Sequence, residues 1–168
     1  MIHAIYILKD GLPLVSGQCS PNAPHFDMDE TRLTGLLAAM NTFCAELGGG
    51  IGEMRSLQTS NNLQFSFMRG DHPDQNMLFI ACHDSSLSSD NAHRTLARIA
   101  TKFMAKFNSL SSFKGQVDIF TDFARALPQL VSESAMETQP LVPPLNSQMP
   151  VLPPLPSIPT SSESGKAA

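Results

Sequence analysis

The pattern of hydrophobic and polar positions changes its period several times along the chain. Residues 2–9 form a nearly continuous apolar run rich in β-formers, which predicts a strand covered on both faces. Asp10-Gly11 is a strong turn signal, so residues 12–17 are expected to return as the second strand of a hairpin. Because Pro13 has no backbone N–H, this second strand is expected at a sheet edge.

A helical period follows the hairpin. Asp29 or Asp27 can cap the helix, and the glycine triplet at 48–50 predicts its end. The predicted buried stripe recurs at steps of three and four and consists of Leu33, Leu36, Leu37, Met40, Phe43, Cys44 and Leu47. Gly35, Ala38 and Ala39 add small residues beside the stripe, where a partner helix can approach closely.

Three strands are predicted in the next third of the chain. Residues 51–58 alternate weakly, and residues 63–67 alternate with one apolar face. Residues 76–83 are apolar on both faces, which predicts a central strand. Successive side chains of a strand point to opposite faces, so Phe79 and Ile80 are expected to be buried on opposite sides of the sheet.

A second amphipathic helix and a short closing helix complete the pattern. The second stripe consists of Ala92, Leu96, Ile99, Ala100, Phe103, Met104 and Phe107. Its polar side carries Arg94, Arg98, Lys102 and Lys106 at spacings of four, which is typical of a solvated face. The closing helix is expected around residues 118–126, and Pro128 is expected to end the pattern.

The last part of the chain has a different composition. We assign residues 1–131 to one domain and residues 132–168 to a Pro/Ser-rich tail that is too poor in packing residues to fold. Two PxxP spacings, Pro140 to Pro143 and Pro150 to Pro153, suit polyproline recognition by an aromatic-lined groove. The other interpretation is a plain disordered tether.

Charge and composition exclude several classes of function. The net charge is −4 and only 15% of the 168 residues are charged, which gives no footprint for nucleic acid. Three widely spaced cysteines without a CxxC motif do not predict zinc. The start lacks a basic segment of a signal peptide, and no apolar run reaches the ~20 residues of a membrane span. We therefore expect a cytoplasmic protein without a transmembrane segment.

The chain shows no recognisable catalytic or cofactor motif. The glycines at 48–50 precede a strand and no Lys follows them, so they do not match a phosphate loop. Asp71, His72 and Asp74 share one polar loop, which fits a solvated turn better than a metal site. No GxSxG is present, and neither Cys44 nor Cys82 has a polar setting. We expect a non-enzymatic protein without a cofactor.

The order strand, strand, helix, three strands, helix, helix resembles the longin and Roadblock-like superfamily. The opening IHAIYILKDGLPLVSGQ resembles a longin hairpin. The stretch LTGLLAAMNTFCAELGGGIGEMRSLQTSNNLQFSFMRG is similar to the first longin domain of the Fuzzy and monensin-sensitivity family, and NMLFIACHDSS resembles its central strand. Stand-alone domains of this kind occur in archaea with many small GTPases. The resemblance implies an α+β fold, ββαβββαα, with a five-stranded, mostly antiparallel sheet flanked by helices.

The same resemblance implies a role in small-GTPase regulation or membrane traffic. Its partners would be a small GTPase, another longin or Roadblock-type domain, or a second copy of the chain, and any location at membranes would come through these partners. The expected interface combines the first helix with the strand at 51–58, and its candidate residues are Gly35, Ala38, Ala39, Glu53 and Arg55. The alternatives are a profilin-like or adaptor-type binder that recruits partners through its tail, and a small-molecule sensor domain.

Overall fold

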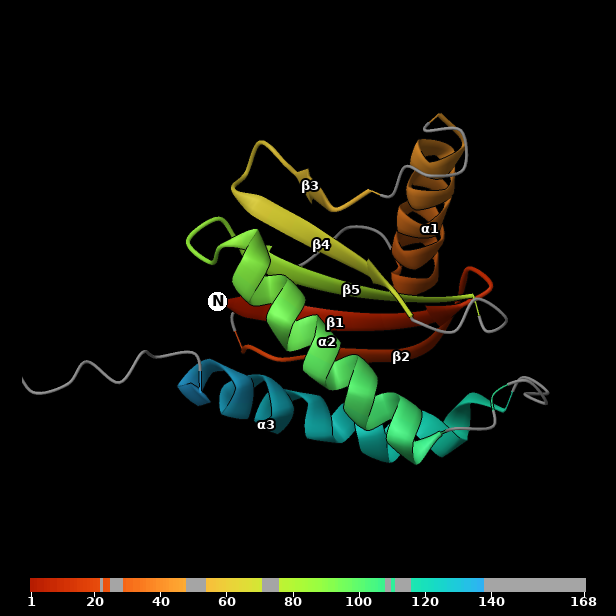
Figure 1. Cartoon of the computed structure of the whole chain (residues 1–168), viewed down its shortest axis with the longest axis vertical. Helices are drawn as coiled ribbons and strands as arrows, with labels where there is room; N and C mark the ends of the chain where they lie inside the picture. Colours follow the sequence, from red (N-terminus) through yellow and green to blue (C-terminus); the bar gives the residue numbers. More distant parts are fainter. Residues whose placement is uncertain are drawn as a thin grey trace, which may run out of the picture.

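The computed structural model describes residues 1–21, 23–24, 29–47, 54–70, 76–107, 110 and 116–137. Its elements, in chain order, are β1 (Ile2–Lys9), β2 (Leu12–Gln18), α1 (Glu30–Leu47), β3 (Ser56–Gln58), β4 (Leu63–Arg69), β5 (Met77–Asp84), α2 (Ser89–Lys106), the 3-10 turn η3 (Val117–Phe120) and α3 (Thr121–Glu137). The described part of the chain therefore forms an α+β domain with one five-stranded sheet and three α-helices (Figure 1).

The sheet has the strand order β2-β1-β5-β4-β3, and every pair is antiparallel. The predictions that Pro13 lies on an edge strand and that residues 76–83 form a central strand are both confirmed. The hairpin turn is also confirmed, because Asp10 and Gly11 adopt the left-handed conformation, with φ of 52° and 80°, that a two-residue hairpin turn needs. β3 lies at the predicted opposite edge but has only three described residues, and residues 51–53 lie outside the described part of the chain.

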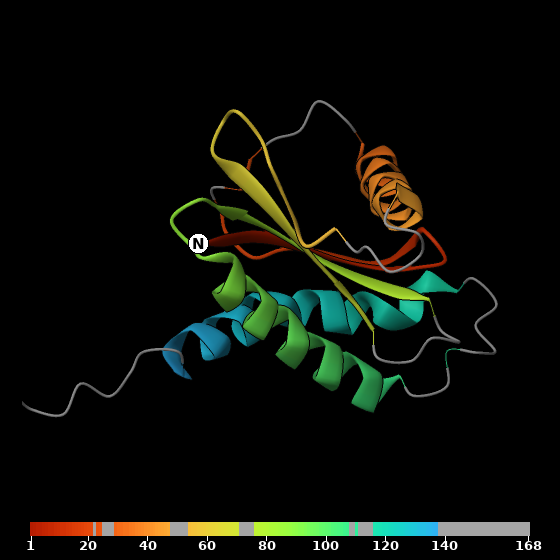
Figure 2. The same ribbon diagram turned by 45° about the horizontal axis from the view of Figure 1, so that its top comes forward.

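The helices cover both faces of the sheet unevenly. α1 lies on one side, and α2 and α3 lie together on the other (Figure 2). Each side has its own apolar cluster, and the central strand β5 contributes alternate residues to each. Phe79 belongs to the cluster under α2 and α3, whereas Ile80 belongs to the cluster on the α1 side. Both side chains are fully buried, so the prediction of opposite faces is confirmed.

Phenylalanines join the two helices of the larger cluster to the sheet. Phe103 of α2 packs edge-on against Phe79 of β5, with ring centroids 6.1 Å apart, and against Phe123 of α3, at 5.2 Å. Phe107 and Phe120 extend the same cluster. Full burial of a side chain of this size contributes about 1.5–3 kcal/mol, so these rings supply much of the packing on this face.

The third helix is longer than the sequence pattern predicts. α3 follows η3 without a break and passes through Pro128, so the prediction that Pro128 ends the pattern is wrong. A proline inside a helix removes the hydrogen bond to the carbonyl four residues earlier, here that of Ala124. Leu127 is fully buried in the core beside it, and this packing stabilises the helix on both sides of the proline.

The extension of α3 also moves the boundary of the domain. Residues 132–137, which composition assigns to the tail, are helical. Two contacts join this part of α3 to α2. Lys102 Nζ lies 2.9 Å from Glu133 Oε2, and Arg98 donates to the Ser134 carbonyl oxygen at 3.4 Å. The described domain therefore continues to residue 137, and the tail from 138 onward lies outside the described residues.

Candidate functional site

Helix α1 carries three of the five residues that the sequence predicts at an interface. The helix begins after Asp29, whose Oδ1 accepts a hydrogen bond from the backbone N–H of Arg32 at 2.9 Å, so Asp29 acts as the predicted cap. Gly35 and Ala39 are exposed on α1, and Ala38 is half-buried. The helix packs on β1 and β2.

The exposed side of α1 includes a stripe of large apolar side chains. Leu36, Phe43 and Leu47 are 49%, 60% and 72% exposed, although the sequence pattern predicts them in the buried stripe. The buried side of the helix consists instead of Leu33, Thr34, Leu37 and Asn41. The apolar arc of α1 is wider than the surface that the sheet offers, so its outer part faces water. Contiguous exposed apolar side chains of this kind mark interaction surfaces more often than solvated helix faces.

A hollow of about 360 Å³ lies between α1 and the β1–β2 turn. Gly35, Ala38 and Ala39 line one side, and their small side chains leave the space open. Asp10 and Asn76 line the other side, where Asn76 Nδ2 donates to Asp10 Oδ1 at 3.1 Å. The pKa of Asp10 lies below its usual value, chiefly because the Lys9 ammonium donates to its carboxylate. The hollow therefore presents a carboxylate that stays charged at neutral pH.

Asn41 is the residue of this hollow that sequence analysis missed. Its side chain is 4% exposed and lines the hollow. An amide at this position can both donate and accept hydrogen bonds toward an occupant of the hollow. The only signal in the sequence is a polar residue four positions after Leu37, inside the apolar period.

The structure does not gather all the candidate interface residues. Arg55 precedes β3 and pairs with Asp90 at the start of α2, with Nη2 3.0 Å from Oδ1. β3 lies at the opposite edge of the sheet from β2, on which α1 packs. Arg55 is therefore placed apart from Gly35, Ala38 and Ala39 in the strand order, and Glu53 lies outside the described residues.

Several other predicted features fall outside the described part of the chain. They are the glycines at 48–50, the loop residues Asp71, His72 and Asp74, and the tail prolines Pro140, Pro143, Pro150 and Pro153. Within the described residues, no three His, Cys, Asp or Glu side chains come together as a metal site. Among the described helices, none combines the length and hydropathy of a membrane span.

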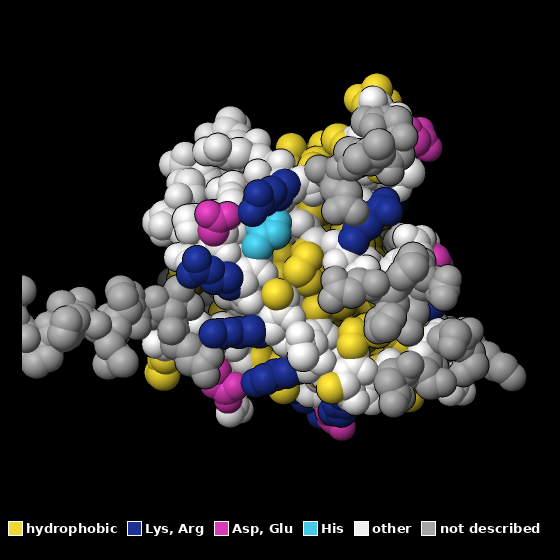
Figure 3. Space-filling view, viewed as in Figure 1, with side chains coloured by type: hydrophobic (Ala, Val, Ile, Leu, Met, Phe, Trp, Pro, Cys, Tyr) yellow, Lys and Arg dark blue, Asp and Glu magenta, His cyan; other side chains and the backbone are white. Residues whose placement is uncertain are grey.

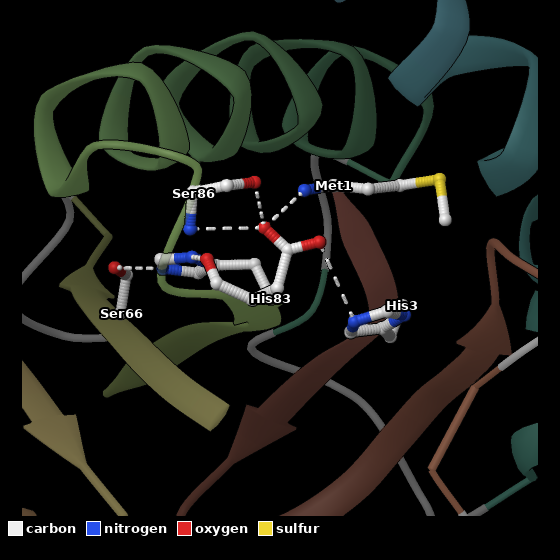
Figure 4. A network of polar contacts seen from close by, with 6 residues as sticks. Met1, His3, Ser66, His83 and Ser86 are labelled. Atoms are coloured by element: carbon white, nitrogen blue, oxygen red, sulfur yellow. Dashed lines mark hydrogen bonds and ion pairs between the residues drawn. The ribbon is translucent and has the colours of Figure 1, made fainter. Parts of the chain in front are cut away.

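A polar cluster lies where β5 ends (Figure 4). The hollow lies at the other end of that strand, beside Met77 and Leu78. Ser66 Oγ is 2.9 Å from His83 Nε2, and His83 Nδ1 is 2.8 Å from the backbone oxygen of Asp84. A carbonyl oxygen only accepts, so in the neutral ring Nδ1 carries the hydrogen and Nε2 accepts from the Ser66 hydroxyl. Burial lowers the pKa of His83, which keeps the ring neutral.

Ser66 and His83 have the contact of a nucleophile and its base, but solvent does not reach them. Both residues are 0% exposed, and a catalytic pair must meet its substrate. The Asp84 carboxylate does not orient the imidazole. Its Oδ1 lies 2.7 Å from the Met1 amino nitrogen and also accepts from Ser86, and these contacts lower the pKa of Asp84 to about 2. The cluster therefore fastens β1, β4 and β5 together.

The cysteines fit a structural role better than a reactive one. Cys82 is fully buried, whereas Cys44 is only half-buried. Burial raises the pKa of Cys82 to about 12 and that of Cys19 to about 11. Because the thiolate is the nucleophile, these two groups stay protonated and unreactive at neutral pH.

Fold and site together define a class of molecule, a small α+β domain with an antiparallel sheet, a covered core and an apolar helix face turned outward. Comparison with known proteins does not refine this class, because no family model and no curated protein matches the chain.

Proposed function

We propose that the chain is a non-enzymatic, longin-type protein-interaction module of the cytoplasm that acts in small-GTPase regulation or membrane traffic. The outer face of α1 carries this proposal. Leu36, Phe43 and Leu47 are large apolar side chains left in water on a helix whose other side is packed. In this function the face pairs with a second copy of the chain or with a related longin or Roadblock-type domain.

The arrangement of the elements supports the same proposal. The order ββαβββα with a closing helix is the order on which the resemblance to longin and Roadblock-like domains rests. Of the described helices, α1 alone covers one face of the sheet, so α1 is the helix best placed to stand between the sheet and a partner (Figure 2). Gly35 and Ala39 lie exposed beside the apolar side chains and allow a partner backbone to approach.

The strength of the association can be estimated from this face. Burial of each exposed side chain contributes roughly 1.5–3 kcal/mol at most, and less for those that are already half covered. Association costs an estimated 4–15 kcal/mol in lost translational and rotational freedom. In a symmetric pair each copy contributes these three side chains, and their partial exposure brings the total to roughly 5–11 kcal/mol. This total lies within the range of the cost, so we expect weak self-association unless a partner domain adds contacts around the hollow.

Light scattering of the full chain over a range of concentrations tests the pairing. We expect Ala39→Arg and Phe43→Asp to reduce association, because each places a charge where the partner would desolvate it. Ala105→Arg is the matched control, since Ala105 is exposed on α2 on the other face. A strict monomer at high concentration, with no related domain bound, would contradict the pairing through α1.

Binding to small GTPases is tested separately. The full chain is used to pull down purified small GTPases of the source organism in both nucleotide states, with Phe43→Asp as the interface variant. Removal of residues 138–168 separates this function from adaptor binding through Pro140 and Pro150. The longin-type function survives that truncation, whereas a tail-mediated adaptor function is lost.

One observation favours a second candidate, the small-molecule sensor. Such a domain needs a pocket with polar groups, and the hollow beside α1 offers the buried Asn41 together with Asp10 and Asn76. A thermal-shift screen of small polar metabolites tests it. A true ligand raises the melting temperature of the wild type and not of Asn41→Leu, whereas no hit that depends on Asn41 would leave the interaction module as the better account.

A further inference from the structure

A second surface, on the opposite face of the sheet from α1, combines an apolar hollow with basic side chains. The hollow lies between the end of β4 and α2 and has a volume of about 310 Å³. Its apolar lining comes from Met68, Ala97, Ala100 and Met104, with Gly70 at the end of β4. Figure 3 shows hydrophobic side chains in this region and Lys and Arg side chains gathered beside them.

Small residues keep this hollow open. Ala97 and Ala100 stand where larger side chains of α2 would fill the space. A Cβ atom at Gly70 would lie 3.1 Å from Met77 Cβ, a tight contact, so glycine eases the close approach of β5 there. The remaining walls are Met68 and Met104, whose flexible side chains adapt to the shape of an occupant.

The basic side chains form a row along α2. Arg94, Arg98 and Lys102 are exposed and spaced by one helical turn, and Arg69 lines the hollow from β4. Lys102 is paired with Glu133, and Arg98 donates one of its N–H groups to the Ser134 carbonyl oxygen. Arg94 makes no ion pair or hydrogen bond with any described residue. The whole chain has a net charge of −4, whereas the side chains of this row are positively charged.

We propose that this surface binds an acidic amphipathic helix of another protein. Apolar side chains of that helix enter the hollow, and its Asp and Glu residues face Arg94 and Arg98. Residues spaced by four on any α-helix are about 6 Å apart along the helix axis. Carboxylates spaced by four on the partner helix therefore match the spacing of the basic residues on α2. Charge complementarity of this kind fixes the partner's orientation and speeds the encounter.

The shape of the surface favours a peptide over a lipid bilayer. Membrane-binding faces push apolar side chains outward into the bilayer. Here Met68 and Met104 are half-buried inside a hollow. A side chain that enters the hollow can contact them, whereas a flat bilayer surface cannot reach them. The proposal uses no residue of α1 and is independent of the pairing proposed above.

The test uses the full chain with ¹³C-labelled methionine methyl groups and NMR detection. The probe is a synthetic 18-residue helix with a Leu/Met stripe flanked by Glu residues four apart, compared with the same helix carrying Gln for Glu. We expect the Glu peptide to shift the Met68 and Met104 signals and the Gln peptide to bind at least about tenfold more weakly. Binding of the Glu peptide should also weaken as salt is added.

Two variants and one control make the result specific. The double variant Arg94→Glu/Arg98→Glu should lose binding at least about tenfold, and Ala100→Leu should weaken binding by filling the hollow while circular dichroism stays unchanged. The control Arg32→Glu/Arg125→Glu changes the net charge equally at two exposed sites elsewhere and should bind like the wild type.

Three outcomes would overturn the proposal. One is the absence of any Met68 or Met104 shift at about 1 mM peptide, where even weak contacts are populated. Another is an equal loss in the control variant, which would show attraction by net charge alone. The third is binding to phosphatidylserine vesicles, lost in Arg94→Glu/Arg98→Glu, without peptide binding, which would assign the surface to lipid.

Discussion

Gly17 of β2 offers a sharp test of how α3 sits on the sheet. A Cβ atom at this position would lie 2.6 Å from Leu127 Cδ1 and 3.0 Å from the carbonyl oxygen of Ala124. No strained dihedral angle requires glycine here, so its role is the close approach of the helix. Gly17→Ala therefore tests the contact between β2 and the part of α3 around Pro128.

The loss of stability caused by Gly17→Ala depends on whether the neighbouring atoms can move away from the new Cβ atom. Ordinary contacts of a Cβ atom lie at 3.4–4 Å, so the strand and helix must separate or Leu127 must turn away. Leu127 is fully buried, and the Ala124 oxygen belongs to the helix backbone, so neither can yield without disturbing the core. Overpacking of this kind costs about 1–3 kcal/mol.

Gly35→Ala is the matched control with the opposite sign. Nothing lies within 4 Å of a Cβ atom at Gly35, which sits in the exposed part of α1. Replacing glycine by alanine in a helix is expected to raise the free energy of unfolding by roughly 0.5–1 kcal/mol. The same chemical change thus destabilises the protein at one position and stabilises it at the other.

Urea denaturation followed by circular dichroism measures both free energies of unfolding. The double variant Gly17→Ala/Leu127→Ala adds a second readout, because shortening Leu127 removes part of the clash and the two losses should then be less than additive. A Gly17→Ala protein as stable as the wild type, with additive losses in the double variant, would refute the docking of α3 on β2.

The remaining predictions concern the core and the polar cluster. Phe79→Ala should cost about 3–5 kcal/mol in a denaturant melt, and a loss under about 1 kcal/mol would contradict its central position. Ser66→Ala leaves His83 Nε2 without a donor and should cost about 1–3 kcal/mol, whereas no loss would mean that the pair is not formed. Because burial lowers the pKa of His83, the neutral ring contributes its full stabilisation to the folded state above the ordinary pKa of 6.5. This stabilisation is lost as the pH falls below 6.5, and a His83→Gln variant should not show this dependence of the free energy of unfolding on pH. The pKa of Asp84 is lowered from 3.8 to about 2, so the ionised carboxylate stabilises the fold above pH 3.8, and this stabilisation is lost as the pH falls from 3.8 to about 2. Asp84→Asn should remove this loss of stability in acid, which amounts to about 1 kcal/mol after allowance for the exposure of the side chain. Native alkylation should spare Cys82, and rapid labelling of that thiol would contradict its burial.

Local signals predicted most of the sheet. Asp10-Gly11, Pro13 and the apolar run around Phe79 each depend on rules that act over a few residues, namely turn geometry, a missing donor and burial on both faces. These features appear in the structure where the pattern places them. Register could not be predicted, because the pairing of Ile7 with Phe79 depends on segments far apart in the sequence.

The errors of prediction lie where tertiary contacts decide. Pro128 is a helix breaker by local rules, but the burial of Leu127 against the sheet holds the helix through it. On α1 the periodicity identifies an apolar arc without telling which part the sheet covers, so Phe43 is exposed and Asn41 is buried. The Ser66–His83 pair was not predicted either, since only the pairing of β4 with β5 brings these residues together.

The position of β1 has a consequence for synthesis of the protein. β1 leaves the ribosome well before β5, its second neighbour in the sheet. Until then the hairpin of β1 and β2 offers one unpaired, apolar strand edge to other chains, the situation that promotes aggregation in nascent sheets. Slow translation before β5 would prolong this exposure, and the yield of folded protein should therefore depend on how quickly residues 77–84 emerge.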